Sequence, residues 1–373
     1  MEFWTNILLF LLSILFYVHL QFQYKKKEDL EIYEMDYLSP TNLQEVTDLK
    51  QPVFFSLEGT ESLFSQLHPE LQEEVIVKDV GDYHRSSSLI TNSEGKKETA
   101  IIGIALSFSS AYGLMDSDPK HVFYSENNGT FLEETEILSA FQKFASKIGT
   151  GWSVQNRYDI LFGSPKVTMP WKFHTSSQRF LVVSPGAGVR VKMTPWKSRK
   201  YMDVVYDYEC FDFWARSVQE TNIKCLDFDL TAGQVLYIPP YWFYSVEFLS
   251  GSPLSEGTNK SQISFLASFT FATPMNIVAN IDHYGYTFFQ KTSSASMIKT
   301  IVPFSSSHKS EKKEDFEEEE EEVQDKNQID PILPEDNTSK IEIQEMLSVI
   351  EKPKLLENPD QDANQDANPS TEN

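Results

Sequence analysis

The feature that most constrains the fold is the segment at residues 231–248, which predicts two β-strands joined by a rigid turn. Residues 235–238 form a short apolar run, two prolines then fix consecutive φ angles, and aromatic and β-branched residues resume at once. Strand side chains alternate between faces, so every second residue of 242–248 should share one face: Trp242, Tyr244, Val246 and Phe248. Tyr244 is therefore predicted to point inward.

The same strand character continues on both sides of this segment. Short runs of apolar and β-branched residues, separated by Gly, Pro, Ser and Asn, predict eight strands at 159–162, 171–174, 179–184, 189–194, 225–230, 235–238, 243–248 and 262–271. The sequence SPGAG at 184–188 predicts a hairpin turn. Eight short antiparallel strands are typical of a jelly roll or double-stranded β-helix barrel, with its core at about 157–273.

Other elements are predicted to flank this barrel. Residues 52–55, 74–77 and 100–108 are apolar enough for strands, and 63–71 for a helical turn. Residues 131–148 carry apolar side chains at helical spacing, after a potential capping box from Thr130 to Glu133, and predict one helix. Residues 276–289 are expected to cover one face of the barrel. The domain as a whole is predicted to span residues 51–304.

The N-terminus predicts a membrane anchor. Residues 3–22 are mostly apolar and, at helical rise, are long enough to cross the hydrocarbon core of about 30 Å. Glu2 precedes the run and no small residues follow it, which favours an uncleaved anchor over a signal peptide. Three lysines at 25–27 lie on its C-terminal side, and the positive-inside rule then puts the bulk of the chain in the cytosol. Residues 23–50 are predicted to be a juxtamembrane linker.

The C-terminus predicts disorder. Residues 305–373 contain 21 Asp and Glu against 7 Lys and Arg, out of a formal net charge of −23 for the whole chain. Such an acidic, repetitive segment repels itself and is expected to form a disordered tail. No basic face for nucleic acid remains, so nucleic acid is excluded as a partner. Two cysteines, Cys210 and Cys225, provide neither a disulfide framework nor a zinc cluster.

The sequence GQVLYIPPYWFYSV at 233–246 resembles a late strand pair of the JmjC/cupin-like 2-oxoglutarate oxygenase superfamily. It is also similar to cupin-like membrane proteins encoded by large DNA viruses, which share the PPYW[WF]YS run and the K-Y and D-Y-E-x-F blocks matched here near residues 200–211. The resemblance covers about residues 157–250. It implies a double-stranded β-helix, and Fe(II) and 2-oxoglutarate as cofactors wherever the ligand set is complete.

The ligand set implied by the resemblance is degenerate. Tyr244 stands where the family has its last iron-binding histidine. In one alignment Lys172 takes the place of the first histidine and His174 that of the carboxylate; in the other, His174 is the first ligand and Ser176 replaces the carboxylate. A neutral phenol and a lysine are poor ligands for Fe(II), so we expect no metal and no catalytic residue at these positions.

The candidate pocket residues are Trp171, Lys172, His174, Arg190, Lys192, Trp242 and Tyr244. With Lys172 and Tyr244 inside, the barrel could hold an anion such as a carboxylate without a metal, because a buried ammonium group needs a partner. A lysine that extends to water is the alternative.

Together these features predict a membrane-anchored, cupin-like, non-catalytic protein that binds a partner or a small anion. If it is viral, the membrane is that of the host cell or the virion. One alternative is an Fe(II)/2-oxoglutarate-dependent hydroxylase acting on proteins. The second is a scaffold protein that works through its acidic tail.

Overall fold

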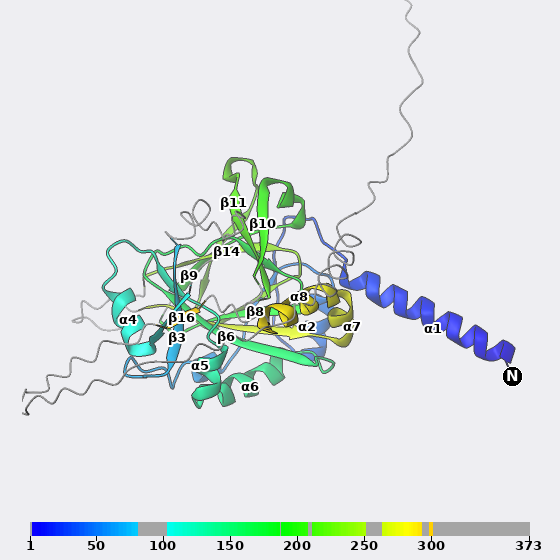
Figure 1. Ribbon diagram of the computed structural model, residues 1–373, viewed down its shortest axis with the longest axis horizontal. Helices are drawn as coiled ribbons and strands as arrows, with labels where there is room; N and C mark the ends of the chain where they lie inside the picture. Colours follow the sequence, from blue (N-terminus) through cyan, green and yellow to red (C-terminus); the bar gives the residue numbers. More distant parts are fainter. Residues whose placement is uncertain are drawn as a thin grey trace, which may run out of the picture. The chain divides into compact units, whose positions relative to one another are not determined.

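Two β-sheets form the framework of the protein (Figure 1). The computed structural model describes residues 2–80, 103–186, 188–207, 211–250, 263–292 and 298–300. Its described residues lie within one compact unit, Met1–Ser305. The predicted acidic tail at 305–373, the loop at 86–99 and Cys210 fall outside the described residues.

The larger sheet has ten strands among the described residues. Their order is β1 (Tyr33–Glu34), β2 (Val53–Ser56), β13 (Gln234–Ile238), β8 (Gln178–Val183), β15 (Phe265–Ala272), β6 (Gln155–Gly163), β5 (Phe123–Ser125), β3 (Glu74–Asp79), β4 (Gly103–Ser107) and β16 (Ile298–Thr300). The outermost pairs, β1 with β2 and β4 with β16, are parallel. The other pairs are antiparallel.

The smaller sheet has six antiparallel strands. Their order is β10 (Met202–Asp207), β11 (Asp212–Val218), β7 (Lys172–His174), β14 (Phe243–Phe248), β9 (Gly188–Thr194) and β12 (Leu226–Thr231). The β-rich architecture is thus confirmed, and all eight predicted core strands are present. The two sheets are not closed into a barrel by hydrogen-bonded strand pairs among the described residues. The barrel itself stays a prediction.

Seven helices accompany the sheets among the described residues, and all except α1 pack against the domain. They are α1 (Glu2–Gln23), α2 (Pro40–Thr47), α4 (Phe108–Asp116), α5 (Gly129–Glu134), α6 (Ile137–Ile148), α7 (Pro274–Ala279) and α8 (Ile281–Thr292). Three 3₁₀ turns, η1 (Thr60–Leu63), η2 (Trp196–Tyr201) and η3 (Glu220–Asn222), complete the described elements.

The larger sheet separates two apolar cores. On one face, phenylalanines of α4, α5 and α6 pack against alternate residues of β6 and β15, such as Phe162 and Phe269. On the other face, Leu161 and Leu266 pack between the two sheets with residues of β9 and β14. The alternation predicted for 242–248 is confirmed: Trp242, Tyr244, Val246 and Phe248 share this inner core. Phe243 packs on the opposite face with Trp171 and Phe173.

The predicted hairpin at 184–188 is wrong. Although Gly186 adopts a positive φ of 72°, as a tight turn requires, β8 belongs to the larger sheet and β9 to the smaller one. The turn therefore carries the chain from one sheet to the other. The Pro239–Pro240 turn does the same between β13 and β14, where Tyr241 at φ 66° donates its backbone N–H to the carbonyl of His174.

The predicted single helix at 131–148 is two helices. The chain leaves the helical conformation at Thr135, whose φ and ψ of −109° and 159° are extended. The Thr135 hydroxyl donates to the Phe131 carbonyl at 2.9 Å, a local bond that competes with the helical ladder. The predicted capping box is also wrong, because α5 begins at Gly129 and Thr130 already lies inside it.

Helix α1 is long and apolar enough to cross a membrane, over Phe3–Gln23, and none of that window is buried in the rest of the protein. An N-terminal signal sequence has the same properties. The segment after it is not the linker predicted for 23–50. It contributes β1 and α2, buries Leu43 to 1% exposure, and binds α6 through a bond from the Tyr37 hydroxyl to the Lys147 carbonyl. Because the segment is mostly polar, no pattern in the sequence marked the residues that pack it against the domain.

Candidate functional site

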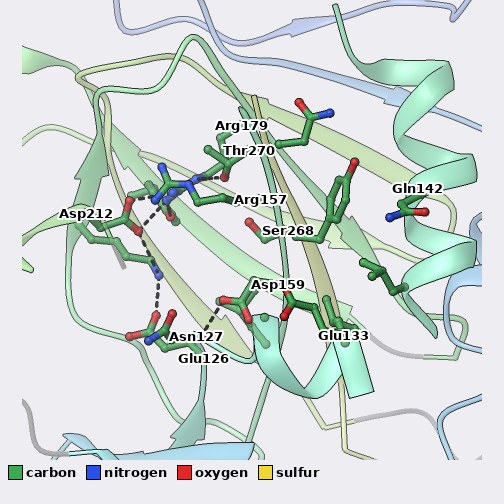
Figure 2. Close-up of a pocket in the computed structure, with 18 residues that line it drawn as sticks. Glu126, Asn127, Glu133, Gln142, Arg157, Asp159, Arg179, Asp212, Ser268 and Thr270 are labelled. Atoms are coloured by element: carbon green, nitrogen blue, oxygen red, sulfur yellow. Dashed lines mark hydrogen bonds and ion pairs between the residues drawn. The ribbon is translucent and has the colours of Figure 1, made fainter. Parts of the chain in front are cut away.

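A cavity of about 320 Å³ lies between the inner face of β6 and β15 and the residues of β7, β11 and β14, with α5 and α6 at its rim (Figure 2). Its lining is unusually rich in charge for the interior of a protein. The charged residues that line it are Glu126, Glu133, Arg157, Asp159, Lys172, Arg179 and Asp212. Tyr244, Ser268 and Thr270 add hydroxyl groups.

Strand pairing places Lys172 at the centre of this lining. Lys172 on β7 lies opposite Tyr244 on β14 and opposite Trp214 on β11. Its ammonium group is 2.7 Å from Glu126 Oε2 and 3.9 Å from Asp212 Oδ2, and only 4% of the residue is exposed. Burial disfavours the ammonium form, but attraction to Glu126, Tyr244 and Asp212 outweighs it and raises the pKa of Lys172. Lys172 is therefore charged and does not extend to water.

Glu126 connects two buried lysines. It follows β5 directly, and its other oxygen, Oε1, accepts from Lys78 Nζ at 2.8 Å. Burial alone would raise its pKa, but attraction to Lys172 and Lys78 lowers it below the usual value. The carboxylate of Glu126 is therefore ionised in a nearly solvent-free position.

Arg179 forms a second buried network beside the first. Its guanidinium donates to both oxygens of Asp212, each at 2.7 Å, and to the Tyr244 hydroxyl at 2.7 Å. Its Nε donates to Thr270 Oγ1 at 3.1 Å. Figure 2 shows the two networks meeting at Asp212, which accepts from Arg179 and lies near Lys172. A bidentate Arg–carboxylate pair of this kind fixes both side chains.

Arg157 and Asp159 extend into the cavity from β6. The Arg157 guanidinium lies 4.2 Å from the centroid of the Phe211 ring, and its Nη2 donates to Ser176 Oγ at 3.3 Å. Burial and repulsion from Arg179 lower the pKa of Arg157. Asp159 accepts from the backbone N–H groups of Asn127 and Asn128 at 2.9 and 2.7 Å, yet burial raises its pKa to about 6.

The groups around this cavity carry charges of both signs in nearly equal number. Among the described residues, the interior network contains four cations, Lys78, Arg157, Lys172 and Arg179, and three carboxylates, Glu126, Asp159 and Asp212. Glu133 also lines the cavity but is exposed to solvent. Lys78 does not line the cavity, so the described lining itself holds three cations and, with Glu133, four carboxylates.

The residues at the expected iron-binding positions do not fit an Fe(II) site. Lys172 is bound to Glu126, and Tyr244 accepts from Arg179 while burial raises its pKa, which keeps the phenol neutral. His174 Nε2 lies 3.0 Å from the Ile238 carbonyl oxygen. Because a carbonyl only accepts hydrogen bonds, Nε2 carries the hydrogen and donates it. Burial and Arg179 lower the pKa of His174 well below its usual range.

Two observations extend this test to the surroundings. Among the described residues, no cluster of three or more His, Cys, Asp or Glu side chains has the arrangement of a metal site. The Nδ1 atom of His174 is buried and has no hydrogen-bond partner in the described part of the chain, but one nitrogen alone does not make a metal site. Ser176, the alternative carboxylate replacement, is bound to Arg157. No reaction step through a metal follows from this arrangement.

Of the seven candidate pocket residues, only Lys172 and Tyr244 line the cavity. Trp242 and Trp171 are packed in apolar clusters on opposite faces of the smaller sheet, and His174 is buried beside the cavity. Arg190 and Lys192 alternate with the buried residues Val189, Val191 and Met193 and so face away from the interior. Arg190 is bound to Asp227 at 2.7 Å on that outer face.

Sequence reasoning missed Glu126, Arg157, Asp159, Arg179 and Asp212. They come from β6, β8, β11 and the end of β5, so no local spacing connects them. A signal was present for two of them: Asp159 and Arg179 interrupt or begin strands that are otherwise apolar. A charge on a strand buried on both faces requires a partner.

The fold and site together define a β-rich protein with one apolar N-terminal helix and a cavity lined by paired charges. No family model matches the chain, and no curated protein matches it. The likeness to the JmjC/cupin-like superfamily therefore remains a resemblance of sequence.

Proposed function

We propose that this chain is a membrane-anchored, cupin-like protein that binds a small carboxylate in its interior cavity without a metal and without catalysis. The observation that carries the proposal is the group of three cations in the cavity lining: Arg157 and Arg179 repel each other there, and Lys172 lines the same cavity. An anion between the two arginines would relieve that repulsion.

The strand order supports the cupin-like part of the proposal. The core strands run between the sheets in the sequence β6, β7, β8, β9, β12, β13, β14 and β15. Within the sheets they lie as β6-β15-β8-β13 and β7-β14-β9-β12. Two four-stranded antiparallel sheets that exchange strands in this way are typical of the eight-stranded jelly roll. The β10–β11 hairpin is an insertion that extends the smaller sheet beyond β7.

The proposal that the protein is non-catalytic is supported by the residues at the three expected iron-binding positions, which are all bound to other protein groups. Lys172, His174 and Tyr244 each have a protein partner, and none of them offers an ionised ligand. The same network makes an anion the better ligand, because an added cation would meet Lys172 and Arg179. The membrane part rests on the length and composition of α1, and the lysines at 25–27 favour a cytosolic domain.

A binding experiment tests the cavity. The full chain, purified in detergent with a chelator present, is titrated calorimetrically with succinate and with 2-oxoglutarate. We expect saturable binding of one molecule per chain, weakened at least about tenfold by Arg157→Gln, since charged hydrogen bonds contribute about 1.5–3 kcal/mol. Arg190→Gln is the matched control, because Arg190 lies on the outer face, and should bind like the wild type.

Two outcomes would overturn the proposal. Equal loss of binding in the two arginine variants, or no binding of any carboxylate, would remove the cavity as an anion site. Turnover of 2-oxoglutarate that depends on added Fe(II) would instead establish the hydroxylase alternative, and the non-catalytic conclusion would fail.

A further inference from the structure

Large apolar side chains are exposed on only part of the described surface. Outside α1 they occur in the N-terminal segment, in the loop before β6 and on α7 and α8, and none lies between β6 and the end of β15. The residues are Tyr24, Tyr33, Leu38, Leu49, Trp152, Val154, Val278, Ile281, Tyr286, Phe288 and Phe289. Trp152 is 83% exposed and Phe289 70%, although aromatic side chains of this size are usually buried. Such a concentration marks an interaction surface.

Helix α8 packs on the domain through one side and exposes large apolar side chains, together with Asp282, on the other. On the packed side Thr287 is buried and contacts the Tyr206 hydroxyl at 3.2 Å, and the Tyr284 hydroxyl donates to Gln155 at 2.7 Å. Ile281 and Phe288 are seven residues apart, which is two helical turns, and therefore lie on the same exposed side. The large apolar side chains of α8 therefore point away from the domain, whereas those of a helix that covers a core point toward it.

The exposed face continues directly from the end of α1. The Tyr24 hydroxyl, one residue after α1, donates to the Ala279 carbonyl at the end of α7 at 2.6 Å. Figure 1 shows α7 beside the C-terminal end of α1. The loop before β6 joins the same place, because the Val154 N–H donates to the Ala272 carbonyl just before α7. The chain thus leaves α1 within the exposed apolar face.

The residue types around this point are those of a membrane interface. Tryptophan, tyrosine and lysine prefer the headgroup region, where an apolar body and a polar tip are both satisfied. Lysines 25–27 follow α1 immediately, and Lys26 Nζ lies 4.1 Å from the Trp196 ring centroid and 4.7 Å from that of Tyr241. Cations next to an apolar face suit anionic lipid headgroups.

We propose that α7, α8 and the loop at 152–154 lie in the interface of the same bilayer that α1 spans, with Ile281, Phe288 and Phe289 inserted toward the acyl chains. The occupant of the exposed apolar face is then lipid. This inference depends on the proposal that α1 is a membrane anchor. The domain would then have two attachments to the bilayer: α1, which spans it, and α7 and α8, which lie in its interface.

Spin labels on the full chain test the inference. Cys210 and Cys225 are replaced by serine, single cysteines are introduced as Ile281→Cys or Phe288→Cys, and the labelled protein is reconstituted into vesicles of phosphatidylcholine and phosphatidylserine. Collision of the label with oxygen, which concentrates in lipid, is compared with collision with a water-soluble nickel chelate. We expect both labels to favour oxygen several-fold over the control described next.

The control label replaces an exposed residue at the edge of the smaller sheet that is far from α8. Asp229→Cys lies on β12, at the opposite edge of that sheet from β10, which contacts α8 through Tyr206. Its label should favour the nickel chelate. A label at Leu12→Cys, in the middle of α1, should favour oxygen. Unfolding temperatures of all labelled proteins verify that each variant is folded.

The outcomes separate the two proposals. If the Leu12 label favours oxygen and the α8 labels behave like that at Asp229, α1 is an anchor and the interfacial contact is wrong. If the Leu12 label is in water, the anchor is wrong and the interfacial contact falls with it. If the α8 labels are immobile and protected from both reagents, protein covers the face, either another segment of this chain or a second copy, and the inference is also overturned.

Discussion

The two faces of the larger sheet differ sharply although the same strands build both. On β6, Tyr158, Ile160 and Phe162 face the helices, while Arg157, Asp159 and Leu161 face the smaller sheet. Phe269 on β15 stacks on Phe141 at 5.2 Å on the first side, whereas its neighbours Ser268 and Thr270 line the cavity on the second. On the helix-facing side, burial of apolar surface stabilises the folded state.

The cavity side must instead compensate for the desolvation of charges. Paired buried charges are seldom more stable than apolar side chains of the same volume. Both faces of the larger sheet have an apolar core that stabilises the fold, and the charges are confined to the cavity on the inner face. The following predictions test that division, beginning with the largest expected effect.

Removal of Glu126 should have the largest effect. Glu126→Leu eliminates the carboxylate that both Lys78 and Lys172 contact, and leaves excess positive charge in the interior. Breaking a buried pair in this way costs about 3–5 kcal/mol of unfolding free energy. Urea unfolding in detergent measures it, and Glu133→Leu, at an exposed site, is the control. Equal stability of the two variants would show that the interior network is hydrated.

The pH dependence of Asp159 should come next. Its pKa is about 6 in the folded protein, raised by burial, against 3.8 for an ordinary Asp. A carboxyl whose folded pKa is raised stabilises the fold fully below its unfolded pKa, and that contribution disappears as the pH rises through 6. Wild type should therefore gain stability relative to Asp159→Asn between pH 7 and pH 4.

The size of this gain follows from the shift. Moving a pKa from 3.8 to about 6 corresponds to at most about 3 kcal/mol, and solvent at this half-buried position reduces the gain to about 1–2 kcal/mol. Unfolding curves across that range measure the difference. Protonation of Asp159 also raises the charge of the cavity, so 2-oxoglutarate, a stronger acid than succinate, should bind more tightly at pH 5 than at pH 8. Parallel pH profiles for wild type and variant would contradict both expectations.

A conservative change on the apolar face should cost less. Ile160→Val removes one methylene group from a side chain that is completely buried against the helices. The expected loss is about 0.5–1.5 kcal/mol of unfolding free energy, with no change in succinate affinity. Val154→Ala, at an exposed position, serves as the control for denaturant unfolding. A change in affinity would show that the two faces are coupled.

Replacement of a complete part of the network should have the smallest effect on stability. The triple variant Lys78→Met, Glu126→Leu, Lys172→Met removes one anion with its two contacting cations and leaves Arg179 bound to Asp212. Its unfolding free energy should stay within about 1 kcal/mol of wild type or exceed it. Succinate affinity should fall, because the cavity loses net positive charge. A large loss of stability would mean that the charges support the fold.

The sequence predicted the strands better than the site for a physical reason. Strands at 157–272 are marked by apolar runs and by Gly and Pro turns, which are local signals, and all eight were found. The β10–β11 hairpin was missed because charged residues such as Asp203 and Asp212 interrupt its apolar pattern. The docking of β1 and α2 was missed because it depends on scattered contacts, such as Leu43 in the core and the bonds of Tyr37 and Thr47 to distant residues.

The cavity depends on contacts across long stretches of chain. Glu126 meets Lys172 across 46 residues and Lys78 across 48, and Arg179 meets Asp212 across 33. Tyr244 and Lys172 were identifiable because a single strand motif predicts their direction. No local pattern predicts which carboxylate will face which cation once the sheets are stacked. The resemblance guided attention to the right strands and to only two of the lining residues.

The attachment of residues 24–28 to the domain has a mechanical consequence. Tyr24 contacts Ala279, Lys26 contacts two aromatic rings, and Glu28 accepts from Lys197, so α1 is joined to the sheets without a flexible linker. If α1 spans a bilayer as we propose, the domain diffuses laterally and rotates about the membrane normal as one piece with it. A ligand of the proposed cavity would then bind at a constant height above the lipid.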